Sequence, residues 1–401
     1  MALRNKYFTQ FSKHFSFFVL GTASISFFLV NIILKDTLTP EKYGVYSIFI
    51  TYISLLSSFG LLGFEQVLIR TTQIIKGKLL VEKEIILPII ISLIIVSFLA
   101  SFIFLNNYPV PINYLYFIFL TMCVIVVKVL YNLFRMLSQF IFAQIALNLW
   151  KIGLFLALVY CIIYGLTLDL IDIVWCISLV FFITTFFIIS FRSNLGFVNL
   201  RSSRKLFKQA TLFFLSLLTI SLINFGDRFF IESRFGLEEL GMYFFYINLF
   251  LFPFTLFQTY VGFKEIVSFK LKYSHNILLL KLKKIVLYGF LFACILFALA
   301  YVIDSLGLYS LEILLNIKVI LLLMLLGIIK MAYSLLSSAM GAICNNQMLY
   351  KINRDSIISI ILVSPFIYYF SFELSITLLF LICLWSIRCV IWYRQLVRFE
   401  N

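Results

Sequence analysis

The segment "LTPEKYGVY" at residues 38–46 is polar and turn-forming, and it lies between two long apolar stretches. A related segment, "FGLEELGMY", occurs 197 residues further along, at 235–243, and again lies between apolar stretches. Aligning the two segments pairs Gly44 with Gly241 and Tyr46 with Tyr243. The recurrence predicts a chain built from two similar halves, with the same short junction after the first helix of each half.

The composition indicates that lipid is the solvent for most of the chain. Of the 401 residues, 63% are hydrophobic and only 12% are charged, whereas a soluble domain carries about 25% charged residues. The net charge of +15 is interpreted as a membrane-topology signal and not as a nucleic-acid surface. The seven cysteines lie mostly in apolar runs without a CxxC pair, which is typical of packing residues.

The apolar runs predict twelve membrane-spanning helices, because a helix needs roughly 20 mostly apolar residues to cross a bilayer. The first run, near Phe15, is interpreted as an uncleaved helix and not as a signal peptide. The predicted spans are 15–34, 43–64, 85–105, 114–134, 143–164, 171–191, 209–231, 240–262, 285–303, 313–337, 355–371 and 375–393.

The basic residues predict the orientation of these spans. With the N-terminus in the cytoplasm, 24 of the 32 Lys and Arg residues fall in cytoplasmic segments, above all in 192–208 and 264–284. Only four fall outside, and the remaining four lie within spans; Lys128 is counted with the cytoplasmic segments, although it also lies within its span. Basic residues collect on the cytoplasmic side of membrane proteins, so both termini are expected in the cytoplasm.

A second internal match supports the division into halves. "VVKVLYNLF" at 126–134 aligns with "IIKMAYSLL" at 328–336, pairing Lys128 with Lys330 and Tyr131 with Tyr333. Six helices per half give parallel repeats, related by an axis along the membrane normal. The predicted fold is an all-α polytopic membrane protein with two pseudo-symmetric six-helix bundles, residues 1–200 and 201–401, around a central cavity.

Several charges lie where a bilayer disfavours them. Lys128, Lys151 and Lys330 fall within predicted spans, at a cost of roughly 2.5–3.5 kcal/mol each near the bilayer centre. We interpret them as lining a cationic cavity that attracts an anionic group. Two other spanning cations, Lys318 and Arg388, are interpreted as residues that snorkel to the headgroups. The doublet Asp227–Arg228 either joins this cavity or marks the outer end of the seventh span.

The sequence offers no catalytic or cofactor motif. It contains neither a GxxxxGK[ST] phosphate loop nor a GxSxG elbow. The two histidines, His14 and His275, lie in basic segments and form no metal-ligand cluster. We therefore expect a protein that is not an enzyme and that holds no metal or other cofactor.

Two junctions carry a family resemblance. The segments "FGLLGFEQVLIR" (59–70) and "DRFFIESRFGLEELGMY" (227–243) resemble the polysaccharide exporters. The chain is similar to Wzx-type O-antigen flippases of the multidrug/oligosaccharidyl-lipid/polysaccharide exporter superfamily. The resemblance covers the whole chain in span count and order, but its specific motifs cover only the junctions. It implies a protein of the bacterial inner membrane that moves an undecaprenyl-pyrophosphate-linked oligosaccharide to the periplasmic leaflet by alternating access.

The resemblance also implies roles for the cavity residues and for partners. Basic cavity residues of the family bind the anionic substrate, and Lys128, Lys151, Lys330 and Arg228 match that role by location and not by a motif; they would bind the pyrophosphate or an acidic sugar, while Asp227 would serve ion coupling or structure. Coupling to a proton or sodium gradient stays open. A repeat-unit polymerase and a chain-length regulator are the implied protein partners, and nucleic acid is not expected.

Two other functions remain as alternatives. A drug/cation antiporter of the same superfamily would place acids in the cavity, and Asp227 is the one plausible buried acid in the sequence. A membrane repeat-unit polymerase would need a long outer loop with catalytic arginines, and the predicted outer loops are all short.

Overall fold

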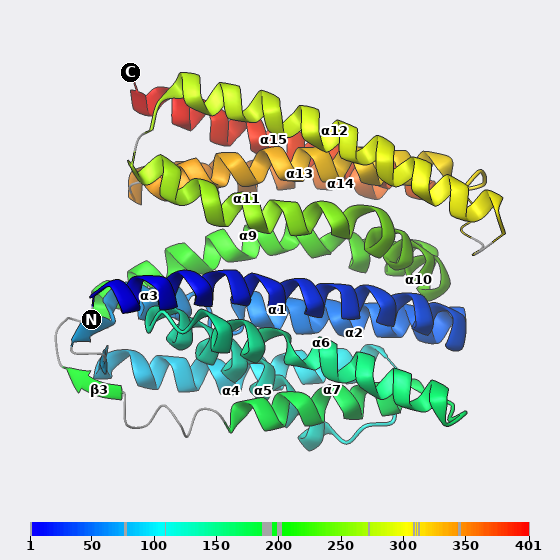
Figure 1. Cartoon of the computed structure of the whole chain (residues 1–401), viewed down its shortest axis with the longest axis horizontal. Coiled ribbons are helices and arrows are strands. Elements are labelled where there is room, and N and C mark those ends of the chain that lie inside the picture. The colour runs from blue at the N-terminus through cyan, green and yellow to red at the C-terminus, as the bar shows by residue number, and fades with distance from the viewer. Residues whose placement is uncertain are drawn as a thin grey trace. The chain divides into compact units, whose positions relative to one another are not determined.

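The computed structural model describes residues 2–75, 78–108, 110–186, 195–198, 203–271, 273–307, 309, 311, 313–343 and 346–400. Nearly all of them are helical, and the protein is an all-α polytopic membrane protein (Figure 1). In the first part of the chain the helices are α1 (Ala2–Thr37), α2 (Pro40–Phe59), α3 (Phe64–Thr71), α4 (Lys83–Asn107), α5 (Tyr114–Met136), α6 (Phe140–Ile163) and α7 (Leu170–Thr185). They are followed by α9 (Ser203–Phe235), α10 (Leu237–Tyr246), the π-helical η2 (Ile247–Leu251), α11 (Phe252–Leu271), α12 (His275–Ser305), α13 (Ile317–Ile343), α14 (Asn346–Phe370) and α15 (Leu374–Glu400).

A helix lies at each of the twelve predicted spans, but fewer of them qualify as clear spans. Among the described residues, nine helices are long and apolar enough to cross a membrane, or ten if the bent pair α2 and α3 counts as one span. Helix α7 has only 16 residues, and the end of its predicted span, together with much of the basic segment 192–208, lies outside the described residues. The first part of helix α14 is polar and includes Arg354 and Asp355.

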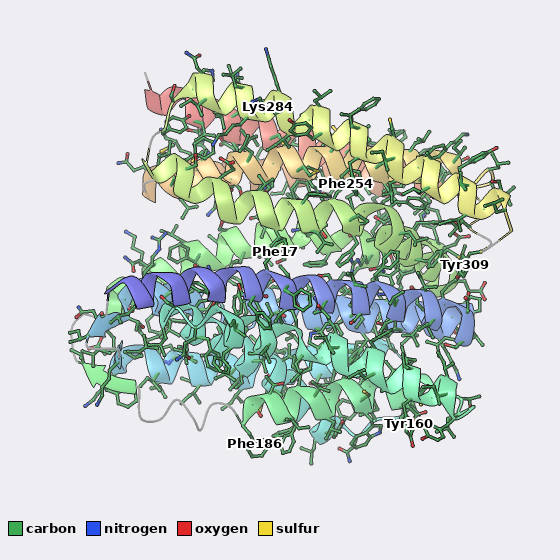
Figure 2. The ribbon with its side chains drawn as sticks, viewed as in Figure 1. Phe17, Tyr160, Phe186, Phe254, Lys284 and Tyr309 are labelled. Atoms are coloured by element: carbon green, nitrogen blue, oxygen red, sulfur yellow. The ribbon has the colours of Figure 1, made fainter. Side chains whose placement is uncertain are left out.

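Exposed apolar side chains cover the outer helices. Figure 2 shows aromatic side chains at the edge of the molecule, among them Tyr160 and Phe186, which are 56% and 55% exposed. Phe254 is instead packed inside, at 1% exposure. Soluble proteins do not expose so many large apolar groups, so these surfaces face hydrocarbon.

Contacts between Cα atoms divide the chain into two compact units. Unit 1 comprises Met1–Ser221 and Phe235–Gly241, and unit 2 comprises Leu222–Arg234 and Met242–Asn401. In unit 1, α5 and α6 are the central helices and pack against α1, α4 and α7. In unit 2, α13 is central, between α11, α12 and α15. The division into residues 1–200 and 201–401 stays a prediction.

The two repeated junctions meet inside unit 1. A Cβ atom on Gly44 would lie 2.1 Å from the carbonyl oxygen of Leu237, and one on Gly241 would lie 3.0 Å from that of Pro40. The contact is reciprocal, because Gly44 and Gly241, like Pro40 and Leu237, are 197 residues apart. The starts of α2 and α10 therefore pass too closely for a side chain at either glycine, which explains why both copies carry glycine there.

A small sheet replaces part of two predicted loops. Strand β1 (Gln73–Ile75) pairs antiparallel with β2 (Lys78–Glu82), which pairs parallel with β3 (Leu195–Val198). The buried Leu79 and Val81 of β2 join a cluster with Leu68 of α3 and Leu130 of α5. The sheet thus packs against both α3 and α5 and covers their apolar contact.

Candidate functional site

The first candidate, Lys128, lies on α5 in unit 1 among aromatic and charged groups. Its Nζ is 4.9 Å from the ring centre of Tyr131, and the guanidinium of Arg135 lies 5.2 Å from the same ring. Lys128 also interacts electrostatically with the carboxylate of Glu65 on α3. The ammonium group is therefore held by a π face and by one acid.

The second candidate in unit 1, Lys151, has a different neighbourhood. It lies on α6, where its Nζ donates a hydrogen bond of 3.0 Å to Oδ1 of Asn148. The rings of Phe27 and Trp150 lie 5.6 and 5.7 Å away. Asn148 in turn donates to the side chain of Gln144. Neutral amides and π faces are thus the neighbours of Lys151, and no acid among the residues that the structure describes pairs with its ammonium group.

Unit 2 brings together the other three candidates. The hydroxyl of Tyr243 donates a 2.6 Å hydrogen bond to Oδ2 of Asp227. Lys330, on α13, is 8% exposed and lies 4.9 Å from the ring centre of Trp385. Its ammonium interacts electrostatically with both Asp227 and Arg228. Two cations and one hydrogen-bonded acid therefore form one group, in which Lys330 is buried and Asp227 and Arg228 are half-buried.

Arg228 completes this group from α9. Its guanidinium lies 5.3 Å from the ring of Phe225 and 5.1 Å from that of Phe244. Arginine stacks well on aromatic faces while its N–H groups remain directed to the sides. The arrangement suits recognition of a planar or anionic group.

The snorkelling interpretation of Arg388 is wrong. Its side chain is only 2% exposed, and its guanidinium lies 5.2 Å from the ring of Tyr333 and 5.6 Å from that of Trp392. Arg388 faces the interface of α15 with α13, so it belongs to the interior of unit 2. Lys318, by contrast, is exposed near the start of α13.

The second internal match has a structural counterpart within each unit. In unit 1, Tyr131 lies one turn after Lys128 and carries Arg135 on its ring at 5.2 Å. In unit 2, Tyr333 lies one turn after Lys330 and also carries an arginine on its ring at 5.2 Å, although this arginine comes from another helix. Each unit thus combines a lysine, a tyrosine and an arginine, but Arg135 is exposed at the end of α5 whereas Arg388 is buried.

Two buried acids, Glu65 and Glu82, were not predicted, since Asp227 was the one buried acid that the sequence suggested. Glu65 is 3% exposed and follows the break between α2 and α3. In the sequence it directly follows the predicted span 43–64. The available signal was the pair Gly60 and Gly63, which can interrupt a helix and turn the following residue inward.

A family comparison decides the identity. The sequence profile of a family described as "Polysaccharide biosynthesis protein" matches residues 14–263, which is more than half of the chain. The chain belongs to this family. The family resemblance that the two junctions indicated is thereby confirmed. No curated protein matches the sequence at a significant level.

Solved structures show the fold of this family member. The MATE multidrug transporter DinF-BH is 15% identical, with 96% of this chain and 94% of that chain covered and a TM-score of 0.59. A MOP superfamily transporter from Pyrococcus furiosus is 13% identical, with 96% and 95% covered and a TM-score of 0.59. An outward-facing MATE family transporter is 13% identical, with 95% and 93% covered and a TM-score of 0.55.

These neighbours share the fold with the chain, but at this level of identity their ligands do not indicate the ligand of this protein. The family and the fold together show a multi-pass membrane protein of polysaccharide biosynthesis with the fold of these transporters. The binding pocket of the Pyrococcus transporter is described as having reversed polarity, so likeness of fold does not determine the charge of a pocket. The substrate must therefore be inferred from the residues of this chain.

Proposed function

We propose that the protein is a flippase for a polyprenyl-pyrophosphate-linked oligosaccharide, with undecaprenyl as the lipid and an O-antigen or capsule repeat unit as the sugar. It moves the headgroup from the cytoplasmic to the periplasmic leaflet of the bacterial inner membrane, and both of its termini are cytoplasmic. The lipid tail stays in the bilayer during transfer. A repeat-unit polymerase and a chain-length regulator are the protein partners.

The observation that carries the proposal is the excess of positive charge inside the spans. The cations are Lys128, Lys151, Arg228, Lys330 and Arg388, of which Lys330 and Arg388 are the most buried. The acids that interact with them are Glu65 and Asp227. Buried charges in membrane proteins mark substrate pathways because they are otherwise too costly to keep. An excess of cations suits a diphosphate.

The cations act by replacing water around the headgroup. A diphosphate loses its hydration when it enters hydrocarbon, and charge-assisted hydrogen bonds from Lys and Arg supply part of what is lost. The aromatic rings beside each cation hold its position without neutralising it. Alternation of the protein between inward-open and outward-open states would then carry the headgroup across.

The two alternatives fit less well. A drug/cation antiporter needs acids to outnumber cations at its site, and within each unit the reverse holds for the charged residues named above, even with Glu65 added to unit 1. A polymerase needs a long outer loop, and the segments between spans on the predicted outer side are short, the longest being 306–316 between α12 and α13.

A deletion strain of the source bacterium tests the proposal. Loss of the gene should leave the lipid-linked repeat unit on the cytoplasmic leaflet, and complementation should restore surface polysaccharide. Unpolymerised repeat units on the outer leaflet of the deletion strain would instead favour the polymerase.

A further inference from the structure

Two neutral amides on α6 lead to Lys151 within unit 1. The side-chain nitrogen of Asn148 donates to two oxygens of Gln144, the backbone carbonyl at 3.1 Å and Oε1 at 3.0 Å. Oδ1 of Asn148 accepts the 3.0 Å hydrogen bond from Nζ of Lys151. A backbone carbonyl can only accept a hydrogen bond. The amide of Asn148 is therefore fixed, with its nitrogen toward Gln144 and its oxygen toward Lys151.

Lys151 lies at a depth where a charge normally has a charged partner. It is about 12 Å into the predicted span 143–164 at the rise of an α-helix, inside a hydrocarbon core about 30 Å thick. Charges at such depth usually pair with an opposite charge or line a cavity. An ammonium has three N–H groups, and one of them donates to Asn148. Lys151 forms no ion pair and no second hydrogen bond with the residues that the structure describes.

The pairing of Lys281 shows what a neutral partner leaves out. Nζ of Lys281 lies 4.9 Å from the ring centre of Phe269, so it also has an aromatic neighbour, but it forms an ion pair with Glu265 as well. A carboxylate beside an ammonium offsets its charge and so weakens its attraction for a further anion. The amide oxygen of Asn148 orients the ammonium of Lys151 and leaves the charge in place.

Aromatic rings confine the ammonium of Lys151 on its other sides. The rings of Phe27 and Trp150 are close enough for cation–π interactions, with centres 5.6 and 5.7 Å from Nζ. These two rings meet edge to face with their centres 5.4 Å apart, and Trp150 stacks on Phe181 of α7 at 5.9 Å. Lys151 itself is half-buried, so part of its side chain stays accessible. The ammonium is thus held by an aromatic wall and an amide, neither of which carries a negative charge.

We propose that Asn148, held by Gln144, is a positioning residue of the anion site, and that its neutrality keeps the charge of Lys151 available to the headgroup. The two N–H groups of Lys151 that Asn148 does not engage then donate to the diphosphate. The inference rests on the proposed function, because it needs Lys151 to contact the headgroup. It predicts that an acid at position 148 harms anion binding more than an apolar residue does.

The test compares variants of the purified full-length protein. Their affinity for farnesyl pyrophosphate is measured by calorimetric titration, and their stability by melting temperature. Asn148→Asp keeps the size of the side chain and replaces the neutral acceptor by a carboxylate, whereas Asn148→Leu removes the hydrogen bond and adds no charge. Lys151→Met removes the ammonium. Gln139→Glu adds a negative charge at the exposed residue that precedes α6, and it is the matched control.

Asn148→Asp should bind the probe roughly tenfold more weakly than wild type or worse, close to Lys151→Met, because the loss is that of a charge-assisted contact. Its melting temperature should be no lower than that of Asn148→Leu, because the new carboxylate pairs with the ammonium. Asn148→Leu should bind with an affinity between those of wild type and Asn148→Asp, and Gln139→Glu should bind like wild type. Affinity and stability would then rank the two Asn148 variants in opposite orders, which a loss of packing alone does not produce.

The other outcomes separate the inference from the proposed function. Affinities of the two Asn148 variants that rank as their melting temperatures do would overturn the inference, because Asn148 would then be only structural. Equal binding by wild type and Asn148→Asp, with weak binding by Lys151→Met, would overturn the inference alone. Wild-type binding by Lys151→Met would remove Lys151 from the anion site and overturn the inference as well. Absence of probe binding by wild type would overturn anion recognition itself.

Discussion

Replacing Lys330 by methionine should strongly reduce transport, while Lys330→Arg should retain part of it. Methionine has a similar length, so Lys330→Met removes the charge and leaves the space against Trp385 filled. Arginine keeps the charge but changes the donor from a compact ammonium to a planar fork. The pair of variants therefore separates the need for a charge from the need for a shape.

The size of the effect follows from the environment of Lys330. The side chain is 8% exposed, so a headgroup bound there loses little to competing water. A charge-assisted hydrogen bond contributes about 1.5–3 kcal/mol, which corresponds to roughly a 10- to 150-fold loss of affinity. Arg228, which interacts with Lys330, remains in the variant, so some binding should persist.

Two measurements check this expectation. Affinity for farnesyl pyrophosphate is measured on purified protein, and surface polysaccharide is measured in complemented deletion cells after normalisation to the amount of protein in the membrane. Normalisation is necessary because removal of a buried charge also changes stability and insertion. Lys318→Ala is the matched control, since Lys318 lies on the same helix but is exposed, and it should behave like wild type.

Export of polysaccharide at the wild-type level by Lys330→Met, with wild-type expression, would refute the role of Lys330 in binding the headgroup. Normal export by Lys128→Met and Lys151→Met as well would refute the role of all three lysines, and the proposed function would then rest on family membership alone.

Three further predictions concern packing, topology and pH. Gly44→Ala should destabilise the protein by about 1–3 kcal/mol in thermal unfolding, because the added methyl group overpacks the junction. Gly21→Ala is the control and should leave stability unchanged, since a Cβ atom at Gly21 has nothing within 4 Å. Equal melting points for the two variants would argue against the close contact at Gly44. A cysteine placed at Ser274 should react with impermeant reagents only from the cytoplasmic side, and labelling of intact cells would reverse the topology. The hydrogen bond from Lys42, and after it the backbone N–H of Leu170 at the start of α7, lower the pKa of Asp169. The loss of folding stability caused by Asp169→Asn should therefore be present at neutral pH and should vanish as the pH falls through that lowered pKa. A loss of stability that is independent of pH would contradict this.

Hydropathy alone predicted the positions of the helices, because the length of an apolar run is set by bilayer thickness. The break between α2 and α3 was not predictable in this way. "FGLLGF" is apolar throughout and contains no proline; its two glycines permit a break without requiring one, and the positive φ angles of Leu62 and Gly63 locate it. The β2 strand was missed because its apolar part is only three residues long, too short to stand out beside a span.

Buried charges were predicted from their position along a membrane span. That position does not determine whether the side chain points into the protein or toward lipid. Arg388 lies near the end of a predicted span, where snorkelling is common, but its face of α15 packs against α13. Glu65 lies at the end of another predicted span, where the bend turns it inward. In both cases the rotation of the helix about its own axis determines whether the side chain is buried. An apolar run that has no polar stripe does not indicate this rotation.

Transfer of a lipid-linked sugar between leaflets by the purified protein is the direct test of the proposed flippase activity. The protein is reconstituted in liposomes with a fluorescent undecaprenyl-pyrophosphate-linked saccharide, and a membrane-impermeant quencher reports the fraction of label in the outer leaflet over time. Wild type should exchange the label between leaflets much faster than protein-free liposomes, and Lys330→Met should be slower. Exchange no faster than in protein-free liposomes, from a preparation that still binds farnesyl pyrophosphate, would contradict the proposed flippase.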